Sequence, residues 1–247
     1  MSWLNEAVGE MLKNVPPDVL SDPTYGFGDI ERVIALVEKA VARNAEETAA
    51  AEREAALKAA ADPNHSFIRN PVFATMARDM FRAELTFPRI LRASLFMAIY
   101  SHTEFLLQSW CEKLSRNGTA DQKLEVFLKK KKGEPGTTLG KLLQYLRDAA
   151  KLDLGDYEKW PEWEAICGYG RARNCLAHNG GIIDRDGDAE KIGKLPCVEI
   201  DASGLLWSEP RIDLLPGACE AAAATTRAFI HRAVESLERD PRRKKSP

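Results

Sequence analysis

Arginine, asparagine and histidine side chains are gathered on one short stretch of the chain, Gly168–Gly181. If this stretch is helical, a rotation of about 100° per residue places Arg171, Asn174 and His178 within about 60° of one another, and Arg173 about 140° from His178. Arginine binds phosphate through parallel hydrogen bonds, and histidine transfers protons near neutral pH. Together they could cleave RNA without a metal, because imidazole moves the proton of the 2′-hydroxyl or of the leaving group while guanidinium stabilises charge on the phosphorane.

The sequence predicts the helix that these side chains need. Pro161 stands at a favoured first-turn position, and Gly180 follows the expected end at about Asn179. Two more helices are expected beside it. Residues 90–114 form the most apolar segment and predict the central buried helix. The other begins at Thr138, its expected cap, and its leucines recur at i, i+3, i+4 and i+7.

A long helix is expected near the N-terminus, from a cap at Asp29 to about Ala60, because this segment has no proline or glycine and has helical apolar spacing. Its alanine-rich end, residues 45–61, fits either an exposed arm or a helix packed through small side chains. The remaining expected elements are a helix at 121–132, a hairpin of strands 197–200 and 205–208, and a last helix at 216–239.

Two residues of the central helix are candidate auxiliary site residues. His102 falls on the apolar stripe that includes Leu95, Ile99 and Leu106, which favours a hydrogen-bonded core histidine over a catalytic one. Glu104 lies on the flank of this stripe, from which it could reach an Arg–His site.

Three other segments resemble known binding motifs but differ from them in spacing or composition. Gly136–Leu142 resembles a phosphate loop but is one residue short between its glycines and has leucine at the magnesium-binding position, which indicates a helix start. Asp184–Asp188 has calcium-loop composition with glycine misplaced, which indicates an acidic turn. Lys129–Lys132 has no interleaved aromatic residues, so a solvated helix end is favoured over a phosphate-binding patch.

Composition excludes several classes of protein. The chain has 35 Lys plus Arg and 37 Asp plus Glu, a net charge of −2, and 45% of its 247 residues are hydrophobic. Residues 239–245 carry a charge of +4, which leaves −6 elsewhere and does not fit a general DNA coater. We expect no membrane segment and no secretion signal. Five scattered cysteines and four dispersed histidines predict neither disulfides nor a metal site, and favour the cytoplasm.

The segment Arg173-Asn174-Cys-Leu-Ala-His178 resembles the hallmark of the HEPN superfamily, in which an arginine precedes a histidine by four to six residues and is often followed by Asn. The pair Arg171 and His178 also fits, at six. Four further features are similar to that family as well. They are the Trp160-Pro-Glu-Trp163 segment before the motif helix, the His-Asn-Gly-Gly segment at its end, the helix at Thr138 and the apolar helix with Glu104.

This resemblance implies a four-helix bundle that dimerises, so that Arg and His from each chain form a composite site. Many such proteins are metal-independent endoribonucleases of toxin–antitoxin or antiphage systems. The resemblance implies that His178 is the general acid or base, Arg173 the transition-state phosphate ligand and Asn174 its orienting partner. Arg171 is the alternative to Arg173 as the phosphate ligand. One branch of the family carries a tyrosine, the target of a nucleotidylating partner, at the position of Gly180, so such a partner is not expected here.

We therefore expect an all-α, HEPN-like helical bundle with a long N-terminal helix and one small β-hairpin. Residues 1–87 are expected to be a helical extension, 88–239 the HEPN-like domain and 240–247 a basic tail. The expected function is metal-independent RNA cleavage by a cytoplasmic homodimer without a cofactor, with an antitoxin or regulatory protein as a further partner. The alternative is a non-catalytic module of the same fold that binds nucleic acid or protein.

Overall fold

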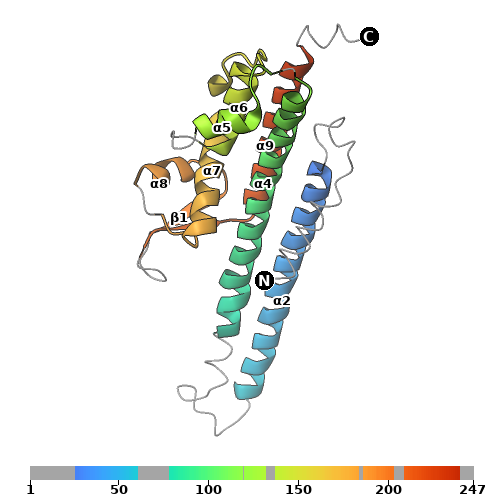
Figure 1. Cartoon of the computed structure of the whole chain (residues 1–247). Helices are drawn as coiled ribbons and strands as arrows, with labels where there is room; N and C mark the ends of the chain where they lie inside the picture. The colour runs from blue at the N-terminus through green and yellow to red at the C-terminus, as the bar shows by residue number, and fades with distance from the viewer. Residues whose placement is uncertain are drawn as a thin grey trace.

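The computed structural model describes residues 26–60, 78–118, 120–131, 137–183, 186–202 and 209–239. Helices and one small hairpin form this part of the chain, as predicted (Figure 1). The elements are α2 (Phe27–Ala60), the π-helical turn η2 (Arg82–Thr86), α4 (Phe87–Arg116), α5 (Leu124–Lys130), α6 (Thr138–Asp148), the 3₁₀ turn η3 (Tyr157–Lys159), α7 (Trp163–His178), α8 (Asp186–Ile192), β1 (Val198–Asp201), β2 (Arg211–Leu214) and α9 (Ala218–Glu238).

Helix α4 is the central element of the bundle. Its apolar side chains are buried against α2, α6, α7 and α9, which confirms the prediction for residues 90–114. Pro88 lies in the first turn of α4, where backbone N–H groups have no partner within the helix. The N–H that proline lacks is therefore not missed, and α4 continues from Pro88 without a break. Because α4 also contacts α5, η2 and β2, its side chains reach several sides of the core.

Helix α2 is buried more deeply through its first half than through its second. Phe27, Ile34 and Val41 are buried, whereas Leu57 is 73% exposed. Figure 1 shows the far half of α2 and the start of α4 running on beyond α9. A stripe that includes Ala45, Ala49 and Ala55 nevertheless stays half-buried, and α2 contacts η2, so the alternative of a helix packed through small side chains fits better than a free arm. The expected cap is wrong, because α2 begins at Phe27 and Asp29 lies in its first turn.

The hairpin is present, but its second strand differs from the prediction. Strand β1 pairs antiparallel with β2, in a register that places Val198 opposite Leu214. The predicted second strand, 205–208, lies outside the described residues. In β2 the side chains of Ile212 and Leu214 are buried while those of Arg211 and Asp213 are half-buried, so alternation identifies this strand.

The shorter helices differ in detail from the expectations. Helix α5 is limited to Leu124–Lys130. The cap of α6 is Thr137 and not Thr138, because the Thr137 side chain accepts a hydrogen bond from the N–H of Gly140 at 3.1 Å. The acidic segment predicted as a turn instead supplies Asp186 and Asp188 to α8. The predictions for the helix after Pro161 and for the last helix are confirmed by α7 and α9.

Candidate active site

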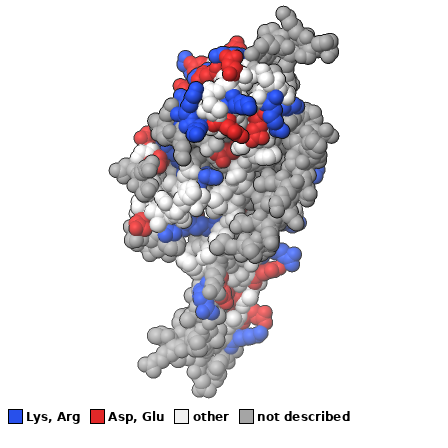
Figure 2. Space-filling view, viewed as in Figure 1, with Lys and Arg blue, Asp and Glu red and all other residues white. Residues whose placement is uncertain are grey.

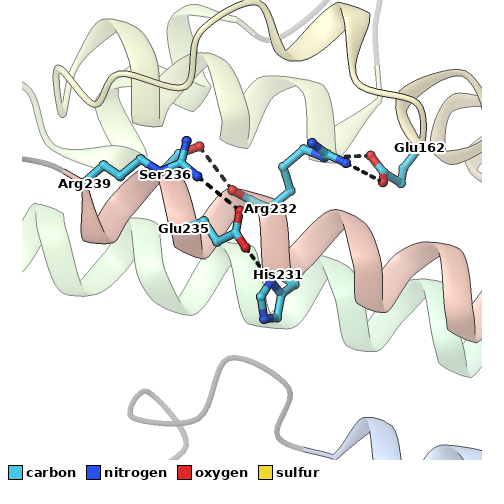
Figure 3. Close-up of polar contacts among 6 residues, drawn as sticks. All are labelled: Glu162, His231, Arg232, Glu235, Ser236 and Arg239. Carbon is cyan, nitrogen blue, oxygen red and sulfur yellow. Dashed lines mark hydrogen bonds and ion pairs between the residues drawn. The ribbon is translucent and has the colours of Figure 1, made fainter.

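Helix α7, which carries the Arg–His motif, is anchored to α9 at its start. The Glu162 carboxylate accepts two hydrogen bonds from the Arg232 guanidinium, both at 3.1 Å (Figure 3). The rings of Trp163 and Phe229 stack with centroids 6.2 Å apart. Two parallel bonds fix orientation as well as distance, so α7 begins at a defined place on the bundle.

Two glycines let α7 approach its neighbours closely along its length. A Cβ atom on Gly170 would lie 2.6 Å from the Tyr100 hydroxyl of α4. A Cβ atom on Gly168 would lie 2.9 Å from Leu195 and 3.2 Å from the carbonyl oxygen of Lys191. At both places the neighbouring side chain would have to shift to admit a Cβ. Helix α7 is therefore held between α4 on one side and the end of α8 on the other.

Arg171 faces α8 and is occupied there. Its Nε atom lies 2.9 Å from a carboxylate oxygen of Asp188, and its Nη1 donates to the carbonyl of Cys167 at 3.3 Å. Both charged side chains are partly buried. This pairing gives Arg171 a structural partner, which the spacing of the motif could not reveal.

Arg173 lies on a different side of α7, close to α4. Its Nη1 atom donates to the Oδ1 atom of Asn174 at 3.0 Å, so the structure pairs these two motif residues. Among the described residues, no carboxylate lies within 4 Å of its guanidinium, although its charge acts on the Glu104 carboxyl. Arg173 therefore has hydrogen-bonding capacity left for an anionic ligand.

His178 is the last residue of α7, and its side chain is exposed. The N–H groups of Asn179 and Gly181 both donate to the carbonyl of Cys175, at 3.0 and 2.9 Å. Between them Gly180 has a φ of +59°, a left-handed conformation that suits glycine at a helix end. The imidazole is thus presented to solvent where the chain turns sharply. Within one chain, Arg173 and His178 are not on the same face of the helix.

Glu104 and His102 stand on opposite sides of α4. Burial raises the pKa of Glu104, while the charge of Arg173 and a hydrogen bond with Thr138 lower it by less. His102 is buried and contacts the ring of Phe27 at the start of α2, with centroids 5.1 Å apart. The structure therefore brings Glu104, but not His102, next to Arg173.

The raised pKa of Glu104 leads to a stability prediction. Because the folded state binds this proton more tightly than the unfolded state, ionisation of Glu104 costs stability as the pH rises from about 4.3, the unfolded pKa, through the folded pKa. We expect Glu104→Gln to raise the melting temperature at pH 7 relative to the wild type, and to have little effect at about pH 4. Glu112 on the same helix, whose side chain is 45% exposed, provides the control, since Glu112→Gln should not give this pH-dependent gain. A loss of stability at pH 7 in Glu104→Gln would contradict the prediction.

The described residues include no group of three or more His, Cys, Asp or Glu side chains placed to hold a metal ion. No helix in the described ranges is both long enough and apolar enough to cross a membrane. Comparison of the chain with protein-family models, with curated proteins and with solved structures gives no match.

Charges are mixed on the face of the molecule seen in Figure 2. Lysine and arginine side chains alternate there with aspartate and glutamate over the end that carries α5 and α6, and the described residues form no continuous basic surface on this face. Lys129 and Lys130 are exposed at the end of α5. On this face, contacts with an anionic polymer would depend on local groups and not on a broad field.

Proposed function

We propose that this protein is a metal-independent endoribonuclease, in which Arg173 binds the scissile phosphate and His178 acts as general acid or base. The O2′–P bond forms as the P–O5′ bond breaks, and the imidazole moves the proton to be removed from the 2′-hydroxyl or added to the leaving 5′-oxygen. Asn174 orients Arg173, and Glu104 is an auxiliary residue next to it. The products are a 2′,3′-cyclic phosphate and a 5′-hydroxyl.

The observation that carries this proposal is the difference between the two arginines. Arg171 is paired with Asp188, whereas Arg173 retains donors that face no carboxylate within 4 Å among the described residues. A guanidinium that is held by an amide and makes no direct ion pair with a carboxylate of the described residues is suited to bind phosphate. This supports Arg173 as the ligand and leaves Arg171 the structural role.

The separation of Arg173 and His178 around α7 supports a composite site. Five residues along a helix correspond to about 7.5 Å of rise and about 140° of rotation, so one phosphate would not meet both side chains easily within one chain. In a homodimer with two-fold symmetry, Arg173 of one protomer can face His178 of the other, so that both side chains can meet one phosphate. The site is then complete only in the dimer.

The biological setting follows from the family resemblance together with the chemistry. An RNA-cleaving dimer of this kind would serve as a toxin or antiphage component, held in check by an antitoxin or another regulatory protein. All five cysteines are free, which supports a reducing compartment such as the cytoplasm.

The test is cleavage of a mixed-sequence single-stranded RNA by the purified protein in EDTA. We expect chelator-resistant cutting that leaves 2′,3′-cyclic phosphate ends. The same RNA with 2′-O-methyl groups throughout is the control, and it should remain intact because it has no 2′-hydroxyl to attack. Absence of cutting by a folded dimer that still binds the RNA would overturn the nuclease proposal in favour of the binding module.

A further inference from the structure

Two arginines on α4 hold the edge of strand β2. The Nη2 atom of Arg89 donates to the carbonyl of Ile212 at 2.9 Å, and the Nη1 atom of Arg92 to the carbonyl of Leu214 at 3.4 Å. The two arginines are one turn apart on the helix, and the two carbonyls are two residues apart on the strand, so they point to the same side. These charge-assisted bonds fix the strand against α4.

Strand β2 in turn holds the chain that leaves α7. The N–H of Ile212 donates to the carbonyl of Gly181 at 2.9 Å, and the N–H of Ile183 donates to the carbonyl of Pro210 at 3.0 Å. Gly181 itself donates back to Cys175 within α7. The segment that begins directly after His178 is therefore bonded both to its own helix and to β2. A shift of β2 would move the end of α7.

The position of Arg92 depends on the N-terminal helix. Its Nε and Nη2 atoms donate to the two carboxylate oxygens of Glu38 in α2, each at 2.7 Å. Arg92 is buried, and the Glu38 side chain is only 20% exposed. A bidentate pair in such surroundings holds the guanidinium in one orientation. Contacts thus run without a gap from α2 through Arg92 and β2 to the end of α7.

We propose that Arg89 and Arg92 are positioning residues for His178, and that α2, through Glu38, sets the geometry of the site that they support. This inference rests on the proposed function, because it assigns a regulation to the same site. Neither arginine touches the substrate. Both act through the backbone of β2, so a regulator that binds α2 would alter catalysis at a distance from the Arg–His residues.

The experiment measures His178 directly in the full-length protein. Imidazole signals of the four histidines are recorded by NMR, and that of His178 is identified by its loss in His178→Ala. We expect Arg89→Gln and Glu38→Gln each to shift or broaden the His178 signal. The matched control is Arg227→Gln, which breaks an ion pair between α9 and Glu31 of α2 that does not involve β2, and which should leave the signal in place.

Kinetics supply the second readout. Where the wild type cleaves RNA, we expect Arg89→Gln to lower kcat about tenfold with little change in KM, since misplacement of a catalytic group by a fraction of an ångström costs rate and not binding. Arg89→Lys keeps a positively charged donor and should recover part of this loss in kcat. It also replaces Arg89→Gln as the test variant if Arg89→Gln does not fold. If the wild type does not cleave RNA, the proposed function fails, but the NMR signals still test the positioning. An unchanged His178 signal in folded Arg89→Gln or Arg89→Lys would overturn this proposal.

Discussion

RNA cleavage is expected to fall about 100- to 10,000-fold when His178 is replaced by alanine, because positioned general acid–base catalysis contributes a factor of this size. His178 is exposed at the end of α7, so the substitution removes little buried surface. The melting temperature should therefore stay within about 2 °C of the wild-type value, since surface substitutions usually change stability by less than about 0.5 kcal/mol. Initial rates with saturating RNA in EDTA provide the measurement.

A second exposed histidine offers the matched control. His231 lies on α9 next to Glu235, with the two side chains 3.3 Å apart (Figure 3). His231→Ala removes an imidazole of similar exposure from a helix that carries none of the motif, and its cleavage rate should equal that of the wild type. Equal losses in the two variants would refute the role of His178.

The second large effect separates the two arginines. Arg173→Ala should lower cleavage about 100- to 1,000-fold, as loss of a transition-state donor does elsewhere, with little change in stability. Arg171→Ala should instead remove the bond to Asp188 and lower the free energy of unfolding by about 1–3 kcal/mol. Its rate per folded molecule should stay within a few-fold of the wild type. Urea unfolding curves and initial rates of both variants check this, and the reverse pattern would assign the phosphate to Arg171.

Mixing two inactive variants tests whether the site is composite. In a heterodimer of His178→Ala and Arg173→Ala, one of the two sites takes its arginine and its histidine from intact positions. Random assortment makes half of the dimers mixed, so about one quarter of the wild-type rate should return. No recovery despite subunit exchange would show that each chain builds its own site.

Helix positions could be predicted from the sequence because apolar periodicity records burial along one face. The stripe that predicted α4 also predicted correctly that His102 belongs to the core. The position of Glu104 on the flank of the stripe also suggested that it could reach the Arg–His site, and the charge of Arg173 does act on its carboxyl, but periodicity could not say which of the two arginines lies beside it. The neighbour of a helix face depends on tertiary packing, which spacing alone does not contain.

The choice between the two arginines could not be predicted for a similar reason. Spacing allowed either Arg171 or Arg173 to pair with His178. The discriminating residue is Asp188, which belonged to a segment predicted as a turn and lies in α8. A carboxylate seventeen residues downstream pairs with a given arginine only through the packing of α8 on α7. The acidic composition near Asp188 indicated that carboxylates were available there, but it did not indicate which arginine they would pair with.

The second strand was misplaced because short strands give weak local signals. Residues 205–207 are apolar, but the partner of β1 is Arg211–Leu214, whose pairing depends on contacts with α4 and with the chain after α7. Such contacts join segments more than 25 residues apart in sequence. Local propensity therefore identified a hairpin but not its register.

The uneven burial of α2 divides this helix into two parts with different rates of hydrogen exchange. Up to Val41 its side chains contribute to the core, so its amides there can exchange only when the bundle itself opens. Beyond that point its described side chains are at most half-buried, so helicity depends more on alanine-rich composition and on surface pairs such as Arg43 with Glu47 and Lys58 with Glu54. Pairs of this kind weaken with salt, and isolated helix segments melt gradually on heating. The outer half of α2 should consequently fray over a wide range of temperature, while the bundle that it extends unfolds in one cooperative step.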